Sequence, residues 1–167
     1  LGDVYKRQLF ADVYTRPDGI VLDLFRVCTE DLKAIEDHSK QKAIVQTLYD
    51  ISENEDFDAA KYLQKKVNFL RPESEQVVKL PVRAWISNQL DPHFTVIEIQ
   101  ALDRIGLLHD VLKTVNDNGL QTVHSRICTE KGAALDSIFV QTLEGRKLVD
   151  PEAIKSLEKS IRELLSG

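Results

Sequence analysis

Two short acidic motifs contain residue types that could hold a metal ion. His109 and Asp110 form a His-Asp pair, which would need further His and Asp ligands from other helices to complete a metal shell. The remaining histidines stand in unrelated contexts, so we interpret His109 as a surface residue of a helix. Asp56 and Asp58 resemble the paired carboxylates that hold Mg²⁺ in nucleotidyl transfer, but they lie in a polar run before a predicted helix. Negative charge at a helix N-terminus explains them better.

Side chains that could act as nucleophiles or as acid-base catalysts are also few. Cys28 and Cys128 have no adjacent His or Lys that would activate a thiolate, and we expect Cys128 to pack in the fold. Asp23 and Asp136 stand at matching positions of two similar segments and could form an acid-base pair. Each lies in the middle of a predicted strand, which favours a structural role.

The segment from Asp103 to Gly106 is the strongest candidate for ligand binding. It joins a predicted strand to a predicted helix, whose free N–H groups and positive dipole end can hold a carboxylate. Gly106 would let a ligand approach the backbone closely. The alternative is structural, with Asp103 capping the helix and Gly106 relieving crowding.

Composition limits the class of protein. The 167 residues carry a formal net charge of −5, and no basic stretch suggests nucleic-acid binding. No apolar run approaches the roughly 18 to 20 residues that a membrane helix needs. Two cysteines without a CxxC pair indicate neither a disulfide framework nor a zinc site, so we expect a cytoplasmic protein. The chain begins with Leu and has no Met, which suggests a fragment, and residues 1–8 match nothing downstream, which suggests a non-native scar.

The elements that position these residues follow from an internal repeat. Residues 13–27 match residues 127–140 once a single residue is gapped in the turn, with Val13 aligned to Ile127 and Asp23 to Asp136. Both copies read as a strand, a Gly-containing turn and a second strand, which is a hairpin pattern. The polar segment between the copies predicts helices over residues 30–49 and 59–66.

The second copy shows a complete order of elements. Residues 94–101 are rich in β-branched and aromatic residues and predict a strand. The following helix has one apolar face and is ended by Asn118 and Gly119. The residues of that face are Leu107, Leu108, Val111, Leu112 and Val115.

A hairpin over residues 120–129 and 133–142 comes next, and then a last helix that begins at Asp150 and Pro151. This order predicts an α+β protein of the ferredoxin-like βαββαβ plan, with residues 82–87 as a strand along the sheet edge. We expect residues 9–50 to be the C-terminal part of a truncated first domain, residues 51–81 a linker with a helix, and residues 82–167 the second domain.

Residues 93–142 resemble an ACT domain, specifically the final one of the bacterial bifunctional PII-protein uridylyltransferase/uridylyl-removing enzymes. The resemblance is carried mainly by TVIEIQALDRIGLL and NDNGL, and the first copy resembles the penultimate ACT domain of that family. This sequence has Ile105 where the family usually has proline, and Gln121 and Thr122 also depart from its pattern.

The resemblance implies a regulatory module that senses a small amino acid, glutamine in these enzymes, for nitrogen regulation. The ligand would lie against a neighbouring ACT domain, in cis or in trans. The resemblance implies contacts to it from Asp103, Arg104, Ile105, Gly106, Leu107, Leu108, Asn118 and Gly119. No catalytic residue, metal site or cofactor is expected in this fragment, whereas the parent enzyme would use Mg²⁺ and act on the PII signal protein. The alternative is an ACT-type dimerisation module without a ligand.

Overall fold

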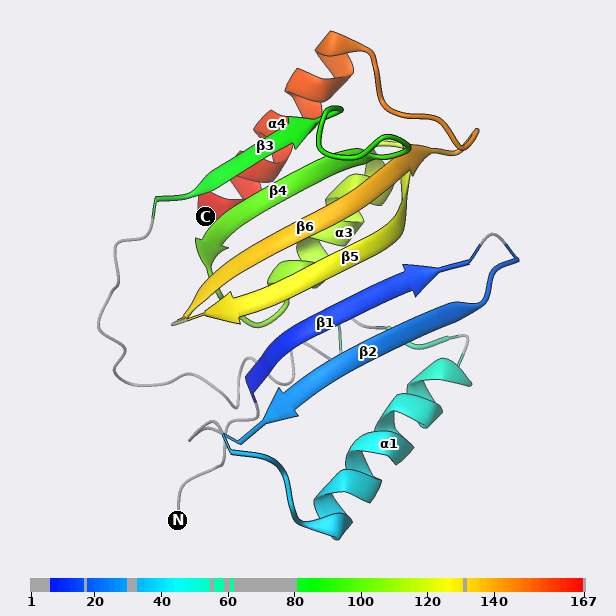
Figure 1. The fold of residues 1–167 in the computed structure, drawn as a ribbon, viewed down its shortest axis with the longest axis vertical. Helices are drawn as coiled ribbons and strands as arrows, with labels where there is room; N and C mark the ends of the chain where they lie inside the picture. The colour runs from blue at the N-terminus through cyan, green and yellow to red at the C-terminus, as the bar shows by residue number, and fades with distance from the viewer. Residues whose placement is uncertain are drawn as a thin grey trace.

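The described strands form one six-stranded antiparallel sheet in the order β2-β1-β5-β6-β4-β3, shown in Figure 1. A computed structural model describes residues 7–16, 18–29, 33–54, 56–58, 61, 81–130 and 132–166. The strands are β1 (Arg7–Thr15), β2 (Val21–Cys28), β3 (Arg83–Ser87), β4 (Thr95–Leu102), β5 (Leu120–Glu130) and β6 (Ala133–Thr142). The helices are α1 (His38–Ser52), α3 (Leu107–Asp117) and α4 (Pro151–Ser166). The predicted α+β, ferredoxin-like class is confirmed.

The core lies between β3 to β6 and the two helices α3 and α4, which cover the same face of the sheet (Figure 1). Along β4, alternate side chains point into this core, as the period of a half-buried strand requires. The largest fully buried apolar side chains include Ile97, Leu120, Ile138, Leu157 and Ile161. No helix among the described residues is long and apolar enough to cross a membrane.

The two helices of the second repeat follow their sequence signals. Leu107, Val111 and Val115 of α3 are buried, because they share one face of the helix. Gly119 follows the helix with φ 73°, in the left-handed conformation predicted for it. The Asp150 carboxylate accepts a hydrogen bond from the backbone N–H of Glu152 (3.1 Å), so the predicted start of α4 is also confirmed.

Strand β3 occupies the sheet edge beside β4, where the sequence predicted it. Its loop is tied to the segment before α4 through Thr95, whose hydroxyl donates to Asn88 Oδ1 (2.7 Å) and accepts from Leu148 N (2.9 Å). Arg162 of α4 donates to the carbonyl of Ala84 in β3 (3.0 Å). A strand that precedes β4 in the chain therefore completes the sheet of the second repeat.

The first repeat contributes the hairpin β1-β2, and β1 pairs with β5 of the second repeat. Strand β2 lies at the open edge of the sheet, and all its residues except Cys28 are exposed. Strand β1 begins at Arg7, so Arg7 and Gln8 belong to the sheet although they lie within the predicted scar of residues 1–8. Residues 1–6 lie outside the described part of the chain.

The prediction of a helix over residues 30–49 was wrong at its start. Residues 33–37 are not helical, and α1 begins at His38. Asp37 fixes this start, because its carboxylate accepts hydrogen bonds from the N–H groups of Ser39 and Lys40. The predicted helix over residues 59–66 lies outside the described residues except for Lys61.

Candidate functional site

The turn between β4 and α3 is anchored to the end of the neighbouring hairpin. The N–H of Asp103 donates to the carbonyl of Gly132 (2.9 Å), and its carboxylate accepts from the hydroxyl of Thr129 (3.2 Å). The structural alternative from the sequence, in which Asp103 caps α3, is therefore wrong. Its side chain joins the turn to β5 instead.

Gly106 is the N-cap residue of α3 and has φ 82°, a backbone conformation that residues with a Cβ atom rarely adopt. No side chain caps this helix. No side chain accepts from its first N–H groups, but that of Leu107 already donates to the carbonyl of Arg104 (3.1 Å). The N–H groups of Gly106 and Leu108 are left at the positive end of the helix for a carboxylate. The backbone conformation explains the glycine more directly than either reason considered from the sequence.

Arg104 of the turn is already paired with a carboxylate in the first turn of α3. Arg104 lies 2.7 Å from one carboxylate oxygen of Asp110, and His109 Nδ1 lies 3.2 Å from the other. Burial raises the pKa of Asp110. The hydrogen bonds and charges of Arg104 and His109 together lower it by more, so the pKa lies below its usual value. The His-Asp pair thus belongs to a salt bridge. The described residues contain no group of three or more His, Cys, Asp or Glu side chains that could hold a metal ion.

The apolar residues of the turn divide between the core and the surface. Leu107 is buried and belongs to the core cluster, and Leu108 is half-buried. Ile105 is 39% exposed at the tip of the turn. A ligand at the N-terminus of α3 would therefore meet Ile105, while Leu107 would act only by holding the helix in place.

Asn118 and Gly119 lie at the other end of α3. The side chain of Asn118 donates to the carbonyl of Thr114 (2.8 Å), which ends the helix. Eleven helical residues separate this end from Gly106, a length of about 16 Å. A single small amino acid cannot contact both loops of one domain, so the structure does not bring these predicted site residues together.

Asp136 lies on the core face of β6, with only 4% of its surface exposed. Burial, together with the nearby Asp103 carboxylate, raises its pKa to about 6, although a hydrogen bond from the backbone N–H of Cys128 (3.2 Å) opposes this rise. Asp23 accepts the corresponding bond from Tyr14 in the first repeat, and partial burial raises its pKa as well, although the residue is largely exposed. Both residues bridge the strands of their own hairpin, which agrees with the predicted structural role.

The remaining candidates from the sequence have local explanations. The Asp58 carboxylate accepts a hydrogen bond from the backbone N–H of Lys61 (2.9 Å). Asp56 donates its own N–H to the side chain of Asn54 (3.1 Å). Cys28 is a buried thiol and Cys128 a half-buried one.

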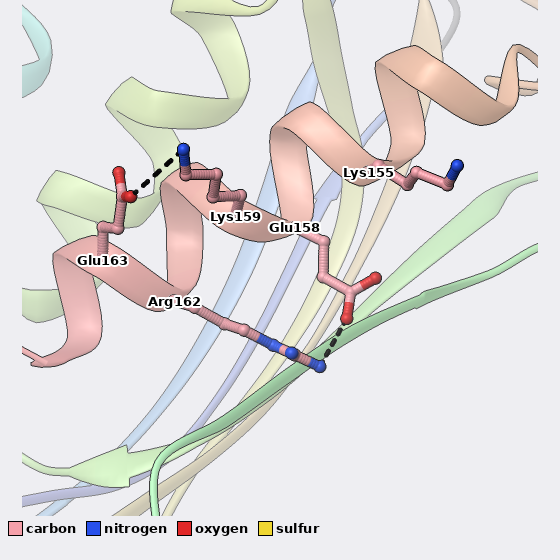
Figure 2. Close-up of a pocket in the computed structure, with 5 residues that line it drawn as sticks. All are labelled: Lys155, Glu158, Lys159, Arg162 and Glu163. Atoms are coloured by element: carbon pink, nitrogen blue, oxygen red, sulfur yellow. Dashed lines mark ion pairs between the residues drawn. The ribbon is translucent and has the colours of Figure 1, made fainter.

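A shallow groove on the outer surface of α4 does not add a site. Figure 2 shows that all the side chains lining it belong to this one helix, and that they pair with one another as Lys159 with Glu163 and Arg162 with Glu158. Lys155, the remaining lining residue, pairs with Glu152 of the same helix (3.0 Å). Among the described residues, no second element therefore lines the groove and none of its lining charges is unpaired. The turn before α3 therefore remains the candidate site.

Comparisons with known proteins agree with this architecture. The chain is 28% identical over 158 residues to a bifunctional uridylyltransferase/uridylyl-removing enzyme of Rhodospirillum rubrum, covering 95% of this chain and 17% of that protein. It is 28% identical over 157 residues to the enzyme of the same name from Gluconobacter oxydans, covering 94% of this chain and 16% of the relative. The chain thus spans about a sixth of the length of these relatives. No solved structure matches it significantly.

A family model described as an ACR9-like, ACT-like domain matches residues 83–166, which comprise β3 to α4. The match covers strands β3 to β6, helices α3 and α4, and the turn from Asp103 to Gly106. On this evidence, the chain belongs to the ACR9-like, ACT-like domain family.

Proposed function

We propose that this chain is the amino-acid-sensing regulatory part of a PII-protein uridylyltransferase/uridylyl-removing enzyme, and that its ligand is glutamine. The observation that carries the proposal is the uncapped N-terminus of α3 behind Gly106, at a turn held in place by Asp103. The similarity to bifunctional uridylyltransferase/uridylyl-removing enzymes supports the choice of enzyme class.

In this proposal, the ligand carboxylate binds the N–H groups of Gly106 and Leu108, because that of Leu107 already donates to the carbonyl of Arg104. A carboxylate is favoured there because the helix dipole is positive at this end. Asp103 lies beside the same turn and can accept a hydrogen bond from the ligand's ammonium group. The side-chain amide of the ligand then contacts a neighbouring ACT domain, because Asn118 and Gly119 of the same domain are too far away.

Occupancy of the site would be passed to catalytic domains that attach or remove UMP on the PII protein. Those domains would be the part of the enzyme that uses Mg²⁺, and the enzyme would act in the cytoplasm. In this proposal, the present chain supplies the binding and regulatory part.

Calorimetry of this chain with glutamine, glutamate and asparagine tests the proposal. We expect glutamine to bind at millimolar concentration or below, and Asp103→Ala with Arg104→Ala to weaken binding more than it lowers thermal stability. Gly106→Val should abolish binding, because valine cannot readily adopt φ 82°.

The matched control is Gly19→Val, which changes a glycine of similar φ (83°) in the β1-β2 turn, far from the site in sequence. It should strain its own turn and leave binding unchanged. If none of the three amino acids binds, or if all bind equally and Gly106→Val has no effect, the sensing proposal is wrong. Association of the chain into dimers would then favour an ACT-type dimerisation module without a ligand.

A further inference from the structure

The two repeats meet where β1 pairs with β5, and the register of this pairing has an approximate two-fold symmetry. The alignment of the repeats places Val13 over Ile127, and therefore Asp12 over Arg126. Asp12 and Arg126 are also direct partners across the β1-β5 pairing. Two equivalent residues that face each other mark a local two-fold axis between the repeats.

Hydrogen bonds within the hairpins support the same alignment in three dimensions. Asp136 accepts a bond from the N–H of Cys128, and Asp23 accepts one from the N–H of Tyr14. Tyr14 and Cys128 are aligned with each other in the repeat, as are the two aspartates. The equivalence of β1 with β5 therefore rests on structure as well as on sequence.

The axis position carries opposite charges. Asp12 Oδ1 lies 3.8 Å from Arg126 Nε and 3.7 Å from His124 Nε2, both on the strand of the other repeat. This oxygen is buried and has no hydrogen-bond partner among the described residues. The His124 ring is held by stacking on Phe139, with ring centroids 5.0 Å apart. Two basic groups of the second repeat thus face one carboxylate of the first.

Pairing of a repeat with a second copy of itself would lose this arrangement. Two β1 strands in the same register would place Asp12 opposite Asp12, and two β5 strands would place Arg126 opposite Arg126 with His124 beside each. Like charges directly opposite in a sheet are destabilising. We propose that the Asp12–Arg126 pair selects pairing of the first repeat with the second over pairing of either repeat with its own copy. This inference does not depend on amino-acid binding.

Two single variants of the full chain reproduce the disfavoured contacts inside the existing interface. Asp12→Arg places two arginines on the axis, as β5-β5 pairing would, and Arg126→Asp places two aspartates there, as β1-β1 pairing would. The measurement is hydrogen exchange of the β1 and β5 backbone amides, compared with amides between β3 and β4. We expect each single variant to increase local opening roughly fivefold at low salt, and the double variant Asp12→Arg/Arg126→Asp to return within about twofold of the original.

Charge-neutral Asp12→Asn should fall between the original chain and Asp12→Arg. Glu36→Arg makes the same charge change at an exposed residue away from the sheet and should leave β1-β5 exchange unchanged. High salt should reduce the effect of the single variants, because the side chains of Arg126 and Asp12 are 61% and 37% exposed. Two results would overturn the proposal. One is that the β1 and β5 amides open no more often in the like-charge variants than in Asp12→Asn. The other is that the double variant does not restore the original exchange rates.

Discussion

Replacing Asp136 by asparagine should stabilise the protein near neutral pH. The carboxyl group lies on the core face of β6 with 4% of its surface exposed, and Asp103 adds a second negative charge nearby. Asparagine has almost the same shape and retains a carbonyl oxygen that can accept the hydrogen bond from Cys128 N. The substitution therefore removes a buried charge while keeping the cross-strand bond.

The size and sign of the effect follow from the pKa. Burial raises the pKa of Asp136 from 3.8 to about 6, so folding favours the protonated acid. Such a group contributes stability below pH 3.8, and this contribution is lost as the pH rises through about 6. Two pKa units correspond to about 3 kcal/mol of unfolding free energy, an order-of-magnitude figure.

The assay is urea denaturation of the original chain and of Asp136→Asn between pH 4 and pH 8. We expect the variant to be more stable by up to about 3 kcal/mol at pH 8, with the advantage shrinking toward pH 4. Asp23→Asn is the matched control, because Asp23 holds the equivalent position in the first repeat but is exposed. Its pH-dependent effect should be much smaller.

An advantage of Asp136→Asn that is the same at pH 4 and pH 8 would refute the reasoning, because it would show that the charge plays no part. Loss of stability at pH 8 would refute it equally. That result would mean that the ionised carboxylate has stabilising contacts that outweigh its burial.

Three further predictions concern the sheet and the chain's activity. Thr95→Val should lower the free energy of unfolding by about 2 kcal/mol, because it removes the hydroxyl that joins Asn88 Oδ1 to Leu148 N. An unchanged midpoint of thermal unfolding would contradict this. Deleting residues 1–8 should lower the melting temperature by about 2–4 °C, because Arg7 and Gln8 pair with β2; no change by calorimetry would show that these pairings contribute nothing. Incubation with UTP, Mg²⁺ and PII protein should give no transfer of UMP, and radiolabelled PII above a no-protein control would show that catalytic residues were overlooked.

The sequence by itself determined the elements whose signals are local. The apolar face of α3, its end at Gly119, the start of α4 at Pro151 and the two Gly-containing hairpins all follow from spacing and turn chemistry. The start of α1 was missed, although the Asp37 cap was present in the sequence. Several polar residues precede that helix, and a local pattern does not say which of them caps it.

Tertiary structure decided which strands pair and how the site is divided. No local sequence pattern specifies that β1 lies beside β5, because this pairing depends on which strand of each repeat lies at the edge of its sheet. The contact between Asp12 and Arg126 was therefore not predicted. The raised pKa of Asp136 depends on its burial in the folded chain and on the nearby Asp103 carboxylate, neither of which a local pattern shows. Asn118 and the Asp103 turn are close in the sequence, but a straight helix separates them in space. Local sequence patterns thus determined the individual helices and hairpins, and long-range packing determined which of them lie side by side.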